Sequence, residues 1–273
     1  MIVDYHTHSA LCRHASGDVE EYILRALELG FDEIGCSDHA PLPGNYDDIH
    51  RMTIEEYYAQ YAPRVSELIS KYDKRIRVRR GMEVDYLAWA DEWNTGFIAE
   101  NDFDFVIGSV HFVGKRGEEK PLFGKEYEPS EIESLYEGYF LEIARSARSG
   151  LFDVIGHCDI VKKFGAFVSP HVQELTWQAL NEIKRADLCI EINTSGLRRD
   201  EREVYPGETI LAMVRDLKIP LTLGSDAHKP EQVGFQFERG LELIERFGLG
   251  KISVFDRRQR SEASVTKLQR AAG

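Results

Sequence analysis

The chain has 273 residues, of which 42% are hydrophobic and 30% are charged, and its formal net charge is −13. This length suits two ordinary domains or one large α/β barrel, and the negative charge argues against broad electrostatic binding to nucleic acid. No stretch approaches the ~18 apolar residues that a membrane span needs. The N-terminus runs straight into a strand-like segment without room for a signal peptide, so we expect a cytoplasmic protein.

Strand-like and helix-like segments alternate along most of the chain. We expect strands at 2–5, 34–37, 76–84, 103–110, 154–156, 188–192 and 221–224. We expect helices at 19–29, from about 53, and at 88–99, 130–148, 172–185, 207–217 and 230–247, with polar loops at 41–51 and 115–129. About seven βα units without a linker predict one domain over residues 1–273 with a closed parallel sheet, although an open doubly wound sheet also fits. From about residue 256 we expect a solvated tail or a short helix.

Histidines and carboxylates stand at the carboxyl ends of these strands. His6 and His8 alternate along the first strand, so both imidazoles point to one side and can reach one ion. Asp226 and His228 repeat this pattern at the last strand. Glu83 follows a glycine at a strand end where a structural role would favour an apolar residue, and a carboxylate can bridge two ions.

Three further histidines, His39, His111 and His157, each end a predicted strand. His14 lies in the loop after the first strand and by itself would suit a surface position. Because the loops after parallel strands converge on one face of an α/β barrel, we expect these side chains to share one pocket. Imidazole and carboxylate ligands are typical of zinc, manganese and iron, and more donors are present than one ion can bind. The pattern therefore indicates a hydrolase with a multinuclear metal site.

Two basic pairs and two cysteines lie close to these motifs. The pairs 162–163 and 198–199 occupy loops after strands, where they either bind a phosphate or remain exposed to solvent. Cys12 and Cys158 flank the proposed ligands and could bind metal, but the neighbouring histidines and carboxylates are the favoured ligands. The sequence contains no Walker loop, Rossmann glycine pattern or Gly-x-Ser-x-Gly motif, so nucleotide-dependent transfer and serine hydrolase chemistry lack support.

The order of the motifs from residue 2 to about 230 resembles the polymerase-and-histidinol-phosphatase (PHP) family. The segments 4–9, 12–15, 33–39 and 108–111 are similar to its histidinol-phosphatase branch. The resemblance implies a distorted (β/α)₇ barrel that holds three divalent ions, which are zinc, iron or manganese. By similarity, the first ion would be held by His6, His8, Glu83 and Asp226, the second by Glu83, His111 and His157, and the third by His14, His39 and His228.

The same resemblance implies hydrolysis of the phosphomonoester L-histidinol phosphate in histidine biosynthesis. The alternatives are another phosphoesterase of the family, acting on nucleoside phosphates, oligonucleotide ends or phosphotyrosine, and an inactive barrel that serves as a binding module. A hydroxide bridging two ions would attack phosphorus, and Lys162 and Arg198 are the preferred residues for neutralising the phosphate. Asp159 is the first candidate for the proton donor and Asp38 the second. None of these patterns indicates the oligomeric state or the residues that recognise histidinol.

Overall fold

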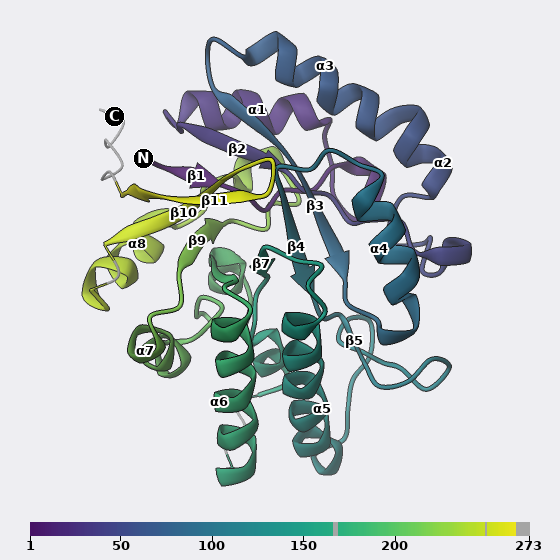
Figure 1. Cartoon of the computed structure of the whole chain (residues 1–273), viewed down its shortest axis with the longest axis vertical. Helices are drawn as coiled ribbons and strands as arrows, with labels where there is room; N and C mark the ends of the chain where they lie inside the picture. The colour runs from purple at the N-terminus through teal and green to yellow at the C-terminus, as the bar shows by residue number, and fades with distance from the viewer. Residues whose placement is uncertain (166–168, 249, 266–273) are drawn as a thin grey trace.

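The computed structural model describes residues 1–165, 169–248 and 250–265. Seven parallel strands form the central sheet in the order β1-β2-β3-β4-β7-β8-β9, and the helices pack around it (Figure 1). The strands are β1 (Val3–Asp4), β2 (Glu33–Cys36), β3 (Arg77–Asp85), β4 (Phe105–Ser109), β7 (Val154–Ile155), β8 (Cys189–Asn193) and β9 (Leu221–Gly224).

Backbone hydrogen bonds close this sheet between its first and last strands. The N–H of Tyr5 donates to the Leu223 carbonyl at 3.1 Å, and the N–H of His8 donates to the Ala227 carbonyl at 2.9 Å. Thr7 and Ala227 also form a parallel bridge just beyond the strand ends. The predicted α/β barrel is therefore confirmed, and the open doubly wound sheet is excluded.

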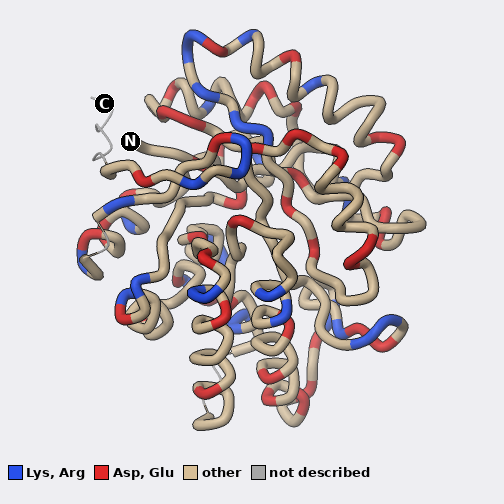
Figure 2. The backbone as a smooth tube through the Cα atoms, in the orientation of Figure 1, with Lys and Arg blue, Asp and Glu red and all other residues tan. Residues whose placement is uncertain are grey.

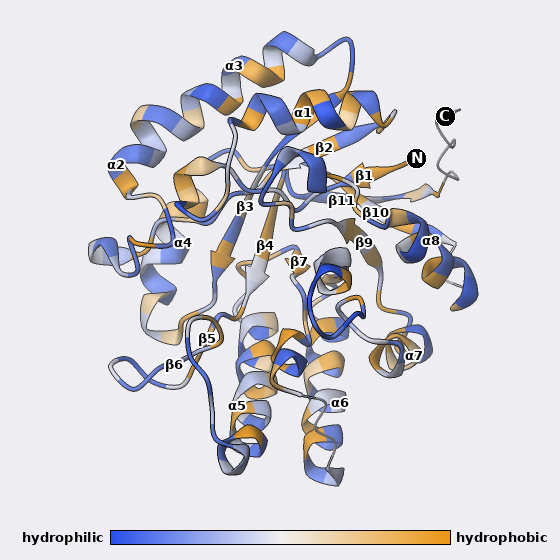
Figure 3. Cartoon of the chain, turned by 180° about the vertical axis from the view of Figure 1, so that it is seen from behind, coloured by the Kyte–Doolittle hydropathy of each residue, from blue (hydrophilic) through white to orange (hydrophobic). Residues whose placement is uncertain are grey.

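The helices alternate with the strands as the sequence pattern predicted. They are α1 (Val19–Glu28), α2 (Ile54–Glu56), α3 (Ala62–Tyr72), α4 (Asp91–Ala99), α5 (Pro129–Arg148), α6 (Pro170–Arg185), α7 (Glu208–Leu217) and α8 (Phe237–Arg246). Hydrophilic and hydrophobic residues alternate along helices such as α1 and α3 (Figure 3), as expected for helices with one face on the sheet. Charged residues of both signs are interspersed over the helices and loops (Figure 2). No described helix is both long and apolar enough to cross a membrane.

Two helix starts illustrate how local sequence sets the boundaries. Thr53 and Glu56 exchange the two hydrogen bonds of a capping box at the start of α2. The helix predicted over 230–247 was too long at its N-terminus. A short 3₁₀ turn covers Pro230–Gln232, and α8 begins only at Phe237, because Gly234 and Gln236 adopt positive φ angles of 66° and 54° that interrupt a helix.

Two short hairpins were not predicted. In the loop at 115–129, β6 (Lys120–Pro121) pairs with β5 (Phe112–Val113). The prediction of a solvated tail or helix from about residue 256 was wrong, because β10 (Lys251–Asp256) pairs antiparallel with β11 (Gln259–Ser264). The hairpin lies beside β1 and the N-terminus (Figure 1), and its Phe255 ring packs on Phe105 at the start of β4. Residues 266–273 of that predicted tail lie outside the described residues.

Candidate metal centre

The nine predicted metal ligands gather at the carboxyl ends of the strands. Seven of them are buried, whereas His228 is partly exposed and His14 is exposed. Glu83 lies among them on β3. His39 follows the neighbouring strand β2 and forms a parallel bridge with Glu83. Residues that are up to 222 positions apart, His6 and His228, thus belong to one cluster.

The first predicted donor set contains His6, His8, Glu83 and Asp226. Nε2 of His8 lies 3.2 Å from Oδ1 of Asp226 and 3.6 Å from Oε2 of Glu83. Nε2 of His6 lies 3.4 Å from Oε1 of Glu83 and 3.9 Å from Asp226. Ligand atoms that surround one ion tetrahedrally at ~2.0–2.2 Å are roughly 3.3–3.6 Å from one another. The spacing in this set therefore fits one transition-metal ion.

The second predicted set is equally compact. Nε2 of His157 lies 3.1 Å from Oε1 of Glu83 and 3.2 Å from Nε2 of His111. The distance between His111 Nε2 and Glu83 Oε1 is 3.6 Å. The two oxygens of Glu83 thus face both donor sets, which is the arrangement of a carboxylate that bridges two ions.

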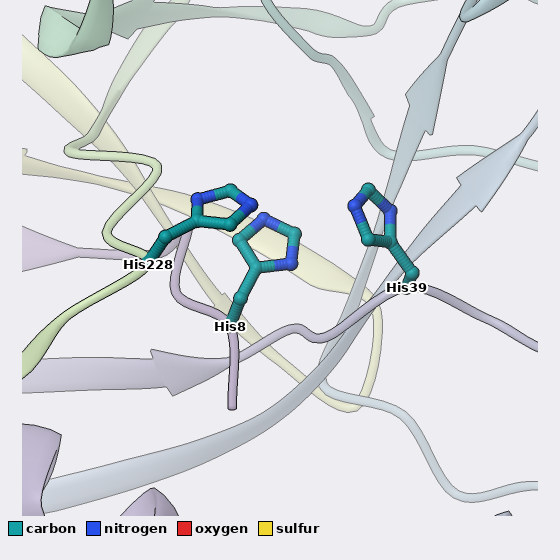
Figure 4. Close-up of side chains that lie close together, drawn as sticks. All are labelled: His8, His39 and His228. Atoms are coloured by element: carbon teal, nitrogen blue, oxygen red, sulfur yellow. The ribbon is translucent and has the colours of Figure 1, made fainter. Parts of the chain in front are cut away.

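The third predicted set is looser. His8, which the family resemblance assigns to the first ion, also lies close to it. Ring nitrogens of His8, His39 and His228 lie no more than 4.8 Å apart. Figure 4 shows the stacked rings of His8 and His228, whose centroids are 4.1 Å apart, with His39 facing them. The ring centroid of His14 is 4.8 Å from that of His228 and 5.3 Å from that of His39. His14 therefore does join the cluster, although its sequence context alone suited a surface residue.

A buried ligand atom without a hydrogen-bond partner indicates that this cluster suits a cation. Nε2 of His6 is buried without a hydrogen-bond partner among the described residues. Such an unsatisfied buried group costs ~1–3 kcal/mol, and metal coordination would satisfy this nitrogen. The donor set of imidazoles and carboxylates therefore fits divalent transition metals.

The charges inside the cluster compensate one another. Burial by itself would raise the pKa of Glu83, but the imidazoles of His39, His6 and His111 outweigh burial and hold this pKa well below its ordinary value. Burial also opposes a charged His6, yet the carboxylates of Glu191 and Glu83 raise the pKa of His6 well above its ordinary value. Since metal ligands must lose their protons, metal binding here would release protons from the histidines.

A carboxylate behind the first two sets orients a ligand of each. Oε1 of Glu191 lies 2.8 Å from Nδ1 of His6, and its Oε2 accepts a hydrogen bond from the backbone N–H of His157 at 3.0 Å. A Cβ atom at Gly224 would overlap this carboxylate, so the glycine at the end of β9 makes room for it. The sequence analysis gave Glu191 no role, although a carboxylate inside an apolar strand was a visible signal.

Asp85 and Asp38 orient two further ligands. Asp85 Oδ1 lies 2.9 Å from Nδ1 of His111, and the buried Arg51 holds the other oxygen of Asp85 at 2.7 Å. Asp38 Oδ1 accepts from the His39 backbone N–H at 2.8 Å and lies 3.4 Å from Nδ1 of His8. Carboxylates in this position fix the tautomer and the direction of a metal-binding imidazole. Nothing in the sequence pattern around Arg51 indicated its contribution.

The contacts of Asp38 favour a role in orienting ligands over its predicted role as a proton donor. Its second oxygen accepts hydrogen bonds from the backbone N–H and the hydroxyl of Ser9. Burial would raise the pKa of Asp38, but the hydrogen bond and charge of His8, with further contacts, lower it below the ordinary value. Both oxygens therefore serve as hydrogen-bond acceptors, and the lowered pKa favours the ionised carboxylate.

Asp159 and Lys162 are also engaged in structural contacts. The Lys162 ammonium lies 3.1 Å from Asp159 Oδ2 and donates to Glu203 at 2.9 Å and to the Val204 carbonyl at 2.6 Å. Asp159 Oδ2 also accepts from the Gly207 N–H at 2.8 Å. These contacts use all three donors of Lys162, so its predicted role in phosphate binding would require it to exchange one of them. They give Asp159 a part in holding the segment before α7. Burial raises the pKa of its carboxyl, and its role as proton donor stays a prediction.

Lys162 and Arg198 were the two basic residues preferred for phosphate binding. Of these, Arg198 keeps a hydrogen-bond donor that no described residue uses. Its Nη2 donates to the carbonyls of Ser225 at 3.0 Å and Asp226 at 2.9 Å. Its Nη1 is buried without a hydrogen-bond partner in the described part of the chain. Arg198 therefore supports the backbone of a predicted ligand and retains one N–H₂ group beside it.

Comparisons with known proteins place the chain among named relatives. The model of the family described as "PHP domain" matches residues 4–195. A protein of Deinococcus radiodurans named "Probable histidinol-phosphatase" is 36% identical and aligns over 94% of this chain and 98% of its own length. The "Histidinol-phosphatase" of Bacillus subtilis is 32% identical, over 88% and 98%.

Two solved structures share the fold. A proposed histidinol phosphatase from Listeria monocytogenes superimposes with a TM-score of 0.78 at 25% identity, covering 87% of this chain and 99% of that one. The histidinol phosphate phosphatase of Lactococcus lactis, solved with zinc, L-histidinol and phosphate, superimposes with a TM-score of 0.77 at 20% identity. It covers 95% of this chain and 98% of its own. The barrel described above is thus a known enzyme architecture.

Proposed function

This chain belongs to the PHP domain family, and we propose that it is a metal-dependent phosphatase that hydrolyses L-histidinol phosphate to L-histidinol and phosphate. The proposal is supported by relatives of that name that align over nearly their whole length. The single observation that carries the chemistry is the position of Glu83, whose two oxygens face two compact donor sets.

We assign the metal ligands as the resemblance to the PHP family implies. Three divalent ions, of zinc, iron or manganese, would be held by His6, His8, Glu83 and Asp226, by Glu83, His111 and His157, and by His14, His39 and His228. Bound ions of this kind lower the pKa of a coordinated water and neutralise charge on a phosphoryl group.

The residues of the chain then have separate tasks. Glu83 holds two donor sets at a common centre, and Glu191 keeps His6 in the orientation that the first set requires. The free Nη1 of Arg198 is the group we assign to a phosphate oxygen, because it lies beside the Asp226 backbone and lacks another partner among the described residues. The burial of most of the ligands keeps the surroundings of the reaction poor in water, which strengthens these electrostatic interactions.

Substrate choice is the direct test. Phosphate release should be measured with L-histidinol phosphate, AMP, phosphotyrosine and p-nitrophenyl phosphate, with metal content determined on the same sample. We expect kcat/KM for histidinol phosphate to exceed the others by ~10³-fold or more, which corresponds to ~4 kcal/mol of transition-state discrimination. Equal or better turnover of another ester would reject histidinol phosphate as the substrate and indicate another phosphoesterase of the family.

A further inference from the structure

Cys12 differs from the other cysteines in its surroundings. All four cysteines of the chain are buried free thiols. Cys36, Cys158 and Cys189 belong to the cluster of apolar side chains that forms the core, whereas Cys12 does not. Buried cysteines usually behave as small apolar residues. Cys12 is as buried as the other three but lies apart from their apolar cluster.

Metal-binding groups surround the Cys12 sulfur. Sγ of Cys12 and ring nitrogens of His14 and His228 lie no more than 4.8 Å from one another. The same limit holds for Cys12 Sγ, a ring nitrogen of His8 and a carboxylate oxygen of Asp38. A sulfur and a nitrogen that share one tetrahedral zinc ion, with bonds of ~2.3 and ~2.0 Å, are roughly 3.6 Å apart. Small side-chain shifts of about 1 Å would therefore bring Cys12 into the coordination shell.

The loop that carries Cys12 is anchored by hydrogen bonds at both of its ends. The N–H of Ser9 donates to Asp38 at 3.0 Å, and the N–H of Ser16 donates to the His228 carbonyl at 2.9 Å. Between them, a 3₁₀ turn (Ala10–Cys12) directs the thiol inward. The backbone thus fixes the position of the Cys12 thiol relative to His228.

Backbone amides also approach the sulfur. The N–H groups of His14 and Ala15 hydrogen bond to Cys12, and such bonds favour the thiolate form. Burial nevertheless raises the pKa of this thiol above its ordinary value. A coordinated divalent cation removes a thiol proton outright.

We propose that Cys12 is a thiolate ligand of the third metal ion, together with His14 and His228. This inference rests on the proposed metal centre. It adds a sulfur ligand to a set that otherwise consists of imidazoles and carboxylates. A soft thiolate selects zinc or iron over manganese, because manganese prefers oxygen ligands. The third ion would then differ in metal preference from the two that share Glu83.

Cobalt reports a thiolate ligand directly. The metal-free protein should be reloaded with Co²⁺, and we expect a near-ultraviolet thiolate-to-cobalt charge-transfer band. Cys12→Ala should abolish the band and release one ion to a chelator at least ~10-fold more readily, the smallest loss typical for weakening a metal site. Cys189→Ala is the matched control, because it removes a buried thiol from the apolar core, and it should retain the band.

A wild-type measurement keeps the test valid if Cys12→Ala does not fold. Cadmium NMR of the Cd²⁺-loaded protein should contain one resonance shifted as expected for a sulfur ligand. Three bound ions without a sulfur signature, or a band that persists in Cys12→Ala, would overturn the proposal. Activity on histidinol phosphate is scored separately: an intact thiolate band in a protein that does not hydrolyse this ester would reject the proposed substrate and support the role of Cys12.

Discussion

Oε1 of Glu191 lies 2.8 Å from Nδ1 of His6, and both side chains are buried. The other oxygen of Glu191 binds the backbone of His157. One carboxylate therefore positions ligands from two donor sets that meet at Glu83. Because a hydrogen-bonded carboxylate also makes an imidazole a stronger ligand, Glu191 is expected to influence metal affinity without binding the ion itself.

Replacing Glu191 with Gln should expose this contribution. The amide keeps the size of the side chain but loses the charge that raises the basicity of His6. We expect metal retention and kcat to fall by ~10–100-fold, the usual loss for an outer partner of a metal ligand. Chelator competition and steady-state kinetics would measure both. Glu174→Gln, an exposed position on α6, is the control and should match the wild type; an unaffected Glu191→Gln variant would refute the positioning role.

Replacing Glu83 with Ala should have a larger effect. The variant loses the carboxylate that faces both compact donor sets, so we expect kcat/KM to fall by ~10³-fold or more, or ~4 kcal/mol, and metal content to decrease. His171→Ala should behave like the wild type, since that side chain is 64% exposed and lies outside the cluster. Full activity and three bound ions in Glu83→Ala would disprove the site assignment.

Lys162 and Arg198 should give opposite phenotypes. Lys162→Met breaks the contacts to Asp159 and Glu203, so we expect the free energy of unfolding to drop by roughly 1.5–3 kcal/mol with little change in KM. Arg198→Met removes the group assigned to phosphate, so KM for the ester should rise by ~10-fold or more, corresponding to ~1.4 kcal/mol of lost binding. Urea unfolding and kinetics on both variants would check this. A higher KM in Lys162→Met alone would restore the original assignment.

Lys163 should make stability depend on pH. Burial, and then the nearby charge of Arg199, lower the pKa of Lys163 to about 8. In the unfolded chain this pKa returns to ~10.4, so between these values the unfolded state binds more protons and stability rises with pH. The wild type should therefore gain stability relative to Lys163→Met between about pH 7.5 and about pH 9.5. Urea unfolding of both proteins at the two pH values tests this; a constant difference would contradict the lowered pKa.

The sequence alone was sufficient for the alternation of strands and helices, because buried strands and amphipathic helices leave strong local patterns. It also placed eight of the nine predicted ligands at or near strand ends, since the βα order implies that those ends converge. His14, in a loop, was assigned only through the family resemblance. Capping at Thr53 was equally local. The hairpin after residue 250 was missed because its outer strand is mostly exposed, so hydrophobic periodicity is weak there.

The partners of each side chain were decided only by the tertiary structure. Lys162 and Arg198 look alike in sequence as basic residues after strands. Lys162 forms ion pairs with Asp159 and Glu203, whereas Nη1 of Arg198 has no hydrogen-bond partner among the described residues. Asp38 sits beside a ligand in the sequence but serves as a hydrogen-bond acceptor. Local sequence determines which groups reach the end of the barrel, whereas hydrogen bonds between distant segments, formed only when the barrel closes, determine which of them remain available for chemistry.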